Sequence, residues 1–505
     1  MIEDFADYTA VVLAAAGVLL LVSSLLSRVG SRLGVPVTLL FLIIGMLAGS
    51  DGPGHIAFDR FDLAYLAGTS ALVIILFAGG LNTELRHLRR VLVPAGVLAT
   101  VGVLGIAGLT ALGAHLLIGK TWSEALLIGA IVSSTDAAAV LVLLDGVPLR
   151  RRIRQTLEAE SGLNDPVAVI LTLAATLNNA GTGTLSWALV PQMAGQLVVG
   201  AVLGIAIGGA GRWLMQHIRL STPALFPVVT LAVALIAYGV PTQVHGSGFL
   251  AVYVAGIVIG NGAIPYRLNL VRFHDSLAWL AQIAMFLMLG LLVFPSHLVG
   301  VAGSGLVLAL YLAIVARPLV VTACLLPFGY SWREVACIAW LGLRGAMPII
   351  LATVPVLMSD NPATPAREVV DEFDLIFFIV VVGSFVPGMT VRWLPRLLGL
   401  EESLPPQPVA EVDITSSLPI RDAQLTLFIG PDSPVAGRTV AELGLPLDAA
   451  VMLIVRNEEI IAPRGHTDLL VGDHAFVLCH AGSAAAVRER FGAITDLKGP
   501  PSGGP

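Results

Sequence analysis

The sequence predicts an all-α polytopic membrane protein with thirteen transmembrane helices and a small cytosolic α/β domain at its C-terminal end. Of its 505 residues, 56% are hydrophobic and 12% are charged, and the mean hydropathy is +0.89. Soluble domains carry roughly twice that charged fraction. The prediction rests on long apolar runs, on the alternation of basic and less basic loops between them, and on a polar segment after Leu400.

The transmembrane helices are predicted from runs of about 17 or more apolar residues that short polar connections separate. The first run lacks a basic region before it and an A-x-A cleavage site, so it is expected to be a span and not a cleaved signal peptide. The spans are expected at about residues 9–27, 34–50, 63–81, 91–118, 122–146, 156–178, 187–211, 223–240, 246–262, 275–294, 299–328, 333–358 and 372–395.

Arginine and lysine residues set the orientation of these spans, because short cytoplasmic loops retain them. The even-numbered loops carry only Arg60, Lys120 and Arg367. The odd-numbered loops carry Arg28, Arg32, Arg86, Arg89, Arg90, Arg150, Arg151, Arg152, Arg154, Arg212, Arg219, Arg267, Arg272 and Arg333. In the cell (inner or plasma) membrane, the N-terminus is therefore expected outside and the C-terminal domain in the cytoplasm.

Thirteen spans can divide into two six-span halves around one linking span, which inverts the second half relative to the first. Inverted repeats are common in secondary transporters, whose sites lie at the bilayer midplane on broken helices. The matched spans would be the fifth, with I-V-S-S-T-D-A-A-A-V, and the twelfth, with L-G-L-R-G-A-M-P. Both are expected to be interrupted, although polar residues, glycine and proline also occur in ordinary membrane helices.

The stretch A-E-S-G-L-N-D-P at residues 159–166 allows two interpretations. Asn164 or Asp165 could cap a helix that starts at Pro166, which would leave the acidic residues before it in water. The twelve residues from Pro166 to the end of the apolar run would then span about 18 Å, against about 30 Å of hydrocarbon. The sixth span is therefore expected to begin near residue 156, with Asp165 inside the membrane.

Asp136 in the fifth span is expected at the same depth as Asp165, roughly 20 Å from the outer surface. A carboxylate buried in the bilayer is costly, so it needs a partner or a function. Glu160 could pair with Arg317, the basic residue well inside the eleventh span, or with Arg344 in the twelfth. Asp136 and Asp165 would then be the acids that can change their protonation state.

A proton and a cation are expected to compete for these two aspartates. Burial favours the neutral acid, whereas a bound cation favours the carboxylate. Hard oxygen ligands for an alkali cation are available from Asp136, Asp165, the Ser161 hydroxyl and the carbonyls of Ser134 and Thr135. No transition-metal spacing is present among His, Cys and acidic residues. No enzymatic activity, no cofactor of the membrane part and no nucleic-acid partner is expected.

Four motifs, in their order and spacing, resemble the monovalent cation:proton antiporter-1 family over residues 1–400. They are T-D in the fifth span, E-S-G-L-N-D-P in the sixth, the intramembrane arginine of the eleventh and G-L-R-G-A in the twelfth. The Asn before the Asp resembles the electroneutral branch, which exchanges one proton for one Na⁺ or K⁺. The implied fold is two inverted six-span repeats per protomer, in a homodimer within the lipid bilayer.

The resemblance also implies a role for each polar residue of these motifs. Asp165 would be the principal ion-binding and proton-carrying residue, Asp136 and Ser161 would complete the cation site, and Thr135 would add a backbone carbonyl. Asn164 would have a structural role at the crossing, where the broken helices of the fifth and twelfth spans meet. Glu160 paired with Arg317, and Arg344 in the motif of the twelfth span, would also have structural roles.

The segment after Leu400 is expected to form a linker at 401–421, a small domain at 422–492 and a disordered tail at 493–505. The stretch from S-P-V-A-G-R-T-V-A-E-L to D-H-A-F-V-L resembles the RCK-C (TrkA-C) regulatory module. Such modules dimerise and sense small ligands, which implies a nucleotide or cyclic dinucleotide as a regulatory ligand. An antiporter with such a tail resembles the potassium/proton, cell volume regulation type, which favours K⁺ over Na⁺.

Three other functions stand as alternatives to potassium/proton exchange. A sodium/proton antiporter of the same family would differ only in its cation. A cation channel or ligand sensor on this scaffold would need a continuous polar path and carbonyl filter sequences such as T-V-G-Y-G, which the sequence lacks. An organic-anion symporter is opposed by two ionised carboxylates at the expected site.

Overall fold

The computed structural model describes residues 10, 13–26, 36–136, 149–180, 189–359, 367–391, 393–401, 422–456, 459–480 and 482–492. The chain divides into two compact units. One consists of Met1–Gly262 and Leu270–Glu402, and the other of Ala263–Asn269 and Ser403–Pro505. The expected linker, apart from Glu401, and the expected C-terminal tail lie outside the described residues.

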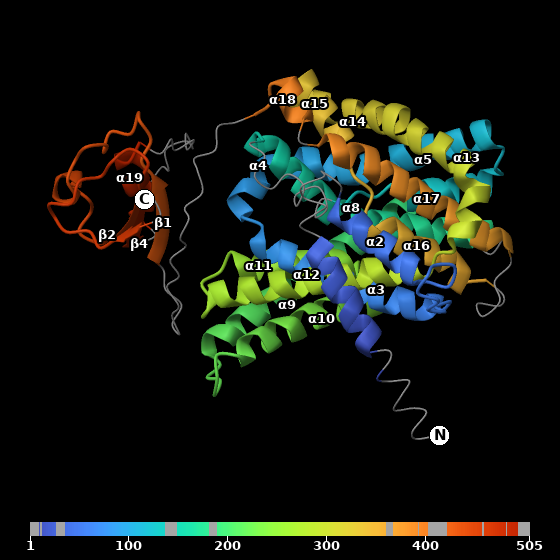
Figure 1. Ribbon diagram of the computed structural model, residues 1–505, viewed down its shortest axis with the longest axis horizontal. Helices are drawn as coiled ribbons and strands as arrows, with labels where there is room; N and C mark the ends of the chain where they lie inside the picture. The colour runs from blue at the N-terminus through green and yellow to red at the C-terminus, as the bar shows by residue number, and fades with distance from the viewer. Residues whose placement is uncertain are drawn as a thin grey trace. The chain divides into compact units, whose positions relative to one another are not determined.

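The first half of the larger unit consists of helices with short connections between them (Figure 1). An apolar helix at Leu13–Leu26 precedes α2, and a π-helical turn at Leu98–Gly102 joins α4 to α5 without a break. The bounds are α2 Val37–Ala48, α3 Phe61–Asn82, α4 Leu85–Val97, α5 Val103–Ile118, α6 Trp122–Ile131, α8 Arg151–Asn179, α9 Leu189–His217, α10 Leu225–Gln243 and α11 Gly248–Gly260.

The second half has the same character, with a π-helical turn at Leu312–Ala316 between α13 and α14 and a 3-10 turn at Leu326–Phe328 after α14. The bounds are α12 Arg267–Leu291, α13 Pro295–Tyr311, α14 Arg317–Leu325, α15 Trp332–Trp340, α16 Ala346–Leu357, α17 Arg367–Thr390 and α18 Leu394–Leu398. Each apolar run predicted from the sequence overlaps at least one helix. A mainly helical unit is therefore confirmed.

Six helices are long and apolar enough to cross a membrane, by length and composition, in the part of the chain that is described. They are Phe61–Asn82, Leu88–Ile118, Leu189–His217, Leu225–Gln243, Arg267–Leu291 and Pro295–Phe328. Shorter apolar helices lie at Leu13–Leu26, Val37–Ala48, Trp122–Ile131, Gly248–Gly260 and Ala346–Leu357.

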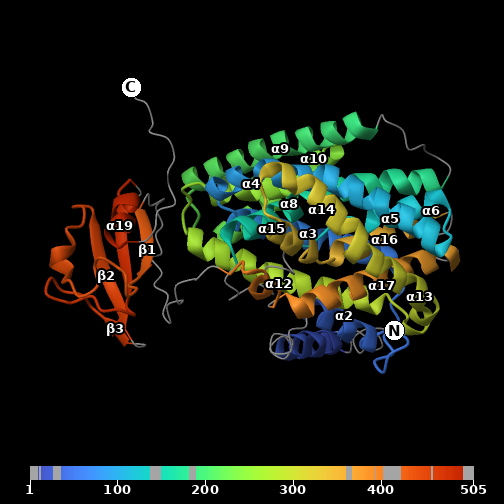
Figure 2. The ribbon, with the colours of Figure 1, turned by 90° about the horizontal axis from the view of Figure 1, so that it is seen from above.

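Small residues allow the helices to approach one another closely. α9 packs against α10 (Figure 2), both pack against α11, and α11 also contacts α3 and α8. On α8, a Cβ added at Gly162 would overlap the ring of Tyr253 on α11. Only glycine therefore fits at this contact, as in the small-residue interfaces of membrane helices. The contact fixes α11 against the helix that carries A-E-S-G-L-N-D-P.

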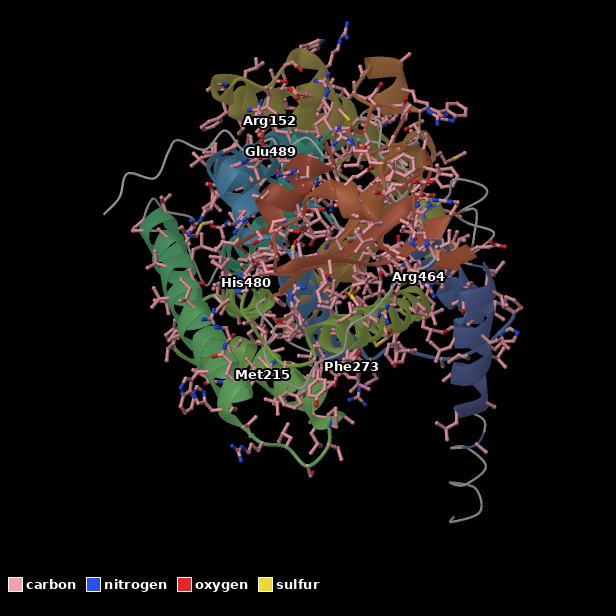
Figure 3. All side chains as sticks on the ribbon, turned by 90° about the vertical axis from the view of Figure 1, so that its left-hand side faces the viewer. Arg152, Met215, Phe273, Arg464, His480 and Glu489 are labelled. Carbon is pink, nitrogen blue, oxygen red and sulfur yellow. The ribbon has the colours of Figure 1, made fainter. Side chains whose placement is uncertain are left out.

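The smaller unit contains a four-stranded antiparallel sheet in the order β1-β4-β2-β3. Its strands are β1 Asp422–Phe428, β2 Ala449–Arg456, β3 Glu459–Ile461 and β4 His474–His480, with a 3-10 turn at Val440–Leu443 and helix α19 at Ala484–Arg490. Alternating apolar residues of β1 and β4 face a core with Ile454, Leu469 and Val487. Arg464, His480 and Glu489 are exposed on this unit (Figure 3). The expected small α/β domain is confirmed.

Candidate functional site

Two helices of the larger unit stop where the sequence predicts interruptions. α6 is followed by the non-helical residues 132–136, and α15 is followed by the non-helical residues 341–345 before α16 begins. The two breaks meet, because the Asp136 backbone N–H donates to the Leu343 carbonyl at 2.9 Å. The part of the fifth predicted span from residue 137 to its end lies outside the described residues.

The two broken helices also start in the same way. T-W-S-E begins α6 and S-W-R-E begins α15, and each forms a capping box that satisfies two backbone donors. The Thr121 N–H donates to the Glu124 carboxylate at 2.9 Å, and the Ser331 N–H donates to the Glu334 carboxylate at 2.8 Å. The two broken helices therefore begin with the same capping motif, which the prediction from the sequence did not use.

Two buried arginines hold the ends of the broken helices. The last carbonyls of a helix have no partner within it, and a cation there is favoured by the helix dipole. Arg344 donates from Nη1 to the carbonyls of Ser133 at 3.3 Å and Ser134 at 2.7 Å. Arg317 donates from Nε to the Ala339 carbonyl at 2.9 Å, and from Nη2 to the preceding carbonyl at 3.3 Å.

Glu160 on α8 forms a buried ion pair with Arg317. Arg317 Nη2 lies 3.0 Å from Oε1 and 3.3 Å from Oε2, and the side chains of Arg317 and Glu160 are 2% and 4% exposed. The Thr135 hydroxyl donates to Glu160 Oε1 at 3.2 Å. The partner of Glu160 is therefore Arg317, whereas Arg344 bonds to carbonyls.

Asn164 connects α8 to the break after α6. Its Nδ2 donates to Thr135 Oγ1 at 2.7 Å and to the Thr135 carbonyl at 3.3 Å. Thr135 thus bridges Asn164 and Glu160, which lie one turn apart on the same helix. A carbonyl oxygen has two lone pairs, so the Thr135 carbonyl keeps the capacity to bind a cation as well.

α8 is a single helix from Arg151 to Asn179, and it runs through the whole of A-E-S-G-L-N-D-P. The alternative interpretation, in which Asn164 or Asp165 caps a helix starting at Pro166, is therefore wrong. Pro166 lies inside the helix, where it lacks the backbone donor of an ordinary residue. α8 begins earlier than the expected residue 156, because an arginine-rich first turn extends the helix beyond the apolar run.

Asp165 differs from Glu160 in its surroundings. It is 7% exposed, and its Oδ1 has no hydrogen-bond partner among the described residues. The half-buried Asp136 lies close enough for the two carboxylates to repel each other. Ser161 precedes Asp165 by four residues on α8, and residues at that spacing share one face of a helix. The structure thus brings two carboxylates to the meeting point of the two breaks.

This arrangement can hold a proton or a hard monovalent cation. Carboxylate, hydroxyl and carbonyl oxygens are the ligands that such cations prefer. In the described segments, no group of three or more His, Cys, Asp and Glu side chains is placed to hold a metal ion. The oxygen atoms present at the site can bind a proton or a monovalent cation.

Comparison with known proteins identifies the family. A family described as sodium/hydrogen exchanger, transmembrane, matches residues 17–397, and the TrkA-C domain family matches residues 426–492. The K(+)/H(+) antiporter NhaP of Alkalimonas amylolytica is 40% identical over 468 residues, which cover 92% of this chain and 80% of that protein. The K(+)/H(+) antiporter NhaP2 of Shewanella oneidensis is 38% identical over 478 residues, which cover 93% and 81%.

The fold is also found in a solved structure, that of the sodium proton antiporter MjNhaP1 from Methanocaldococcus jannaschii. The two structures align with a TM-score of 0.63 and 23% sequence identity, and the alignment covers 75% of this chain and 99% of the MjNhaP1 chain. The family and the tail module that the motifs indicate are thereby confirmed. The chain belongs to the sodium/hydrogen exchanger family of transmembrane proteins.

Proposed function

We propose that this protein is an electroneutral potassium/proton antiporter, which exchanges one K⁺ for one proton by alternating access. The observation that carries the proposal is the buried Asp165 carboxylate. One of its oxygens has no partner among the described residues, and it lies beside Asp136 where two helix breaks meet. Family membership supports cation/proton exchange, and relatives that are named K(+)/H(+) antiporters support potassium as the cation.

Competition for one site explains why the two fluxes are coupled. A buried carboxylate that is charged and empty is costly, and either a proton or a monovalent cation relieves that cost. The loaded site changes its exposure from one side of the membrane to the other, whereas the empty site does not. Because each substrate carries one positive charge, a full cycle moves no net charge.

The polar residues divide into ligands and supports. Asp165, Asp136 and Ser161, with the Thr135 carbonyl, form the cation site, and the aspartates carry the proton. Glu160 takes no part in the exchange, because Arg317 and Thr135 occupy its oxygens.

Asn164 has a structural role, because its amide orients Thr135. By resemblance, Asn164 stands where electrogenic relatives have a second aspartate, and this neutral side chain keeps the exchange one-for-one. Arg344 has a structural role at the crossing.

Sodium is the second candidate cation. The structural neighbour MjNhaP1 is named a sodium proton antiporter, but its 23% identity shows the fold alone. The relatives at 40% and 38% identity are named for potassium.

The membrane architecture that goes with this function is thirteen spans in two inverted repeats, in a homodimer of the cell membrane with the N-terminus outside. The support from the structure is the match between α6 and α15, which share a capping box and then break. The halves that contain them are the two that an inverted repeat would relate.

The TrkA-C domain acts as a cytosolic regulator that binds a small ligand such as a nucleotide or cyclic dinucleotide. The end of the membrane unit offers a route for this regulation. The Arg150 N–H donates to the Leu400 carbonyl at 3.2 Å, and Leu149 pairs with Glu401 as an isolated antiparallel bridge. Since α8 begins at Arg151, the segment that leads to the tail is hydrogen-bonded to the start of the helix that carries Asp165.

The test is cation-induced dissipation of a pH gradient in proteoliposomes that contain the full chain. K⁺, Na⁺, Li⁺ and Rb⁺ are added separately at several pH values from neutral to alkaline. We expect K⁺ to dissipate the gradient at the lowest concentration. A response to Na⁺ alone would replace potassium by sodium, and no response to any of the four cations would overturn the antiporter proposal.

A further inference from the structure

A pocket next to Arg317 and Arg344 is lined by residues of α13, α15 and α17. Its polar side chains are those of Arg317, Arg344 and Trp340, and its described lining includes no acidic residue and neither Asp165 nor Asp136. The remaining lining residues are Ala309, Leu312, Ala313, Ala339, Gly342, Gly383 and Pro387. The pocket thus combines two cationic groups with an apolar wall.

Both guanidinium groups have donors left over. Arg317 is 2% exposed and its Nη1 has no hydrogen-bond partner, and Arg344 is 3% exposed and its Nη2 has none, among the described residues. A buried donor without a partner is costly, the more so when it is charged. Two such donors lining one pocket indicate that an acceptor occupies it.

Two carbonyls of the described lining residues already accept a hydrogen bond. The Ala339 carbonyl already accepts from Arg317 Nε, and the Arg344 carbonyl accepts from the Ser384 hydroxyl. The Trp340 indole is itself a donor, and it is bonded to the Thr390 hydroxyl at 2.8 Å. We therefore infer an acceptor that is not among the described residues of the lining.

We propose that this pocket binds a small inorganic anion of the halide class, such as chloride. The two guanidinium groups are close enough to repel each other, the Glu160 carboxylate offsets only part of that repulsion, and an anion between them offsets the rest. Charge-assisted hydrogen bonds from two cations favour an anion over a neutral acceptor. The bound anion would tie the start of α14 to the break between α15 and α16, and it does not depend on which cation is transported.

The experiment uses the purified full chain in a maltoside detergent, which contains no phosphate group. Bromide replaces gluconate at constant ionic strength while the midpoint of thermal unfolding is followed, because a ligand that binds the native state raises it. We expect a saturable increase with bromide, and an anomalous bromide peak between Arg317 and Arg344 in crystals. Equal midpoints in bromide and gluconate, or bromide peaks only elsewhere, would overturn the proposal.

Two matched variants connect the effect to this pocket. A Cβ at Gly383 would lie 3.7 Å from Arg344 Cγ, which is ordinary contact, and the longer side chain of Gly383→Leu is chosen to fill the pocket. Gly303 on α13 has open space around its added Cβ. We expect Gly383→Leu to weaken bromide binding at least about tenfold, by the loss of a charge-assisted contact. Gly303→Leu should leave it unchanged. If Gly383→Leu does not fold, Gly383→Ala replaces it, and unchanged bromide binding in the variant would overturn the assignment.

Discussion

Two acidic residues lie five positions apart on α8 and have opposite surroundings. Glu160 is held by Arg317 and by the Thr135 hydroxyl, whereas Asp165 keeps an oxygen without a partner in the described part of the chain. The sequence shows both as acids beside a long apolar run. The sequence indicates that Glu160 is the acid with a cationic partner, but the residues alone leave Arg317 and Arg344 as alternatives. The ion pair between α8 and α14 shows that the partner is Arg317.

The role of Asp165 predicts that Asp165→Asn abolishes potassium/proton exchange and leaves a folded protein. Asparagine cannot gain and lose a proton, and it removes the charge that binds the cation. Because Asp165 has no ion-pair partner in the described part of the chain, thermal stability should stay equal or rise. The measurement is K⁺-induced dissipation of a pH gradient, with the exposed Asp59→Asn as control. Transport that persists in Asp165→Asn would contradict the assigned role.

The buried ion pair predicts the reverse pattern for Glu160→Gln. Removing one partner of a buried pair leaves the Arg317 charge uncompensated and typically costs about 3–5 kcal/mol of stability. Glu160→Gln should therefore unfold at a clearly lower temperature than the wild type and than Asp165→Asn. Thermal unfolding in detergent measures this order. A Glu160→Gln protein as stable as Asp165→Asn would show that the pair does not stabilise the fold.

At the scale of elements, the sequence predicts where the fifth and twelfth spans break, because polar residues and glycine interrupt an apolar run. It does not predict how the breaks are stabilised. Arg344 meets the carbonyls at the end of α6, and Arg317 meets those at the end of α15. Arg344 and Ser134 are 210 positions apart in the sequence, and Arg317 and Ala339 are 22 positions apart. Local sequence patterns cannot show contacts over such separations. The repeated T-W-S-E and S-W-R-E motifs are a local signal that could have matched the two helices.

The crossing predicts that Gly345→Ala disrupts transport. A Cβ at Gly345 would overlap the Asp136 carboxylate, so the aspartate or the break must shift. A displacement of about 1 Å can reduce the rate of a positioned site about 100-fold. The control is Gly79→Ala on α3, where a Cβ meets no atom within 4 Å. Exchange rates and thermal unfolding are measured for both variants, and normal exchange by Gly345→Ala would show that the site tolerates the shift.

For the whole molecule, the division into a membrane unit and a small C-terminal domain could be predicted, because composition changes sharply after Leu400. The strands of the tail follow from alternating apolar residues, whereas the 3-10 turn at Val440–Leu443 has no such signal. The strand order β1-β4-β2-β3 depends on long-range pairing and could not be predicted. The same holds for the hydrogen bond between Arg150 and Leu400.

That connection predicts a regulatory role for the tail. Deleting residues 402–505 leaves the backbone contacts of Leu400 with Arg150 and of Glu401 with Leu149 in place. Exchange should therefore continue, while its dependence on pH or on the tail ligand changes. A chain that ends at Pro395 would also lose the hydrogen bond to Arg150, so its exchange activity should differ from that of the full chain by more. Both truncated proteins are compared with the full chain in proteoliposomes. Identical pH and ligand dependence in all three would show that the tail does not regulate exchange.

The most direct test of one-for-one exchange at Asp165 uses matched gradients in proteoliposomes. The ratio of internal to external K⁺ is set equal to the ratio of internal to external protons, and internal pH is followed with and without valinomycin, which imposes the potassium diffusion potential. Electroneutral exchange is then at equilibrium at any potential. We expect no drift of internal pH in either case, and a drift when the ratios are unequal. A drift at matched ratios that valinomycin alters, and that Asp165→Asn abolishes, would contradict electroneutral exchange.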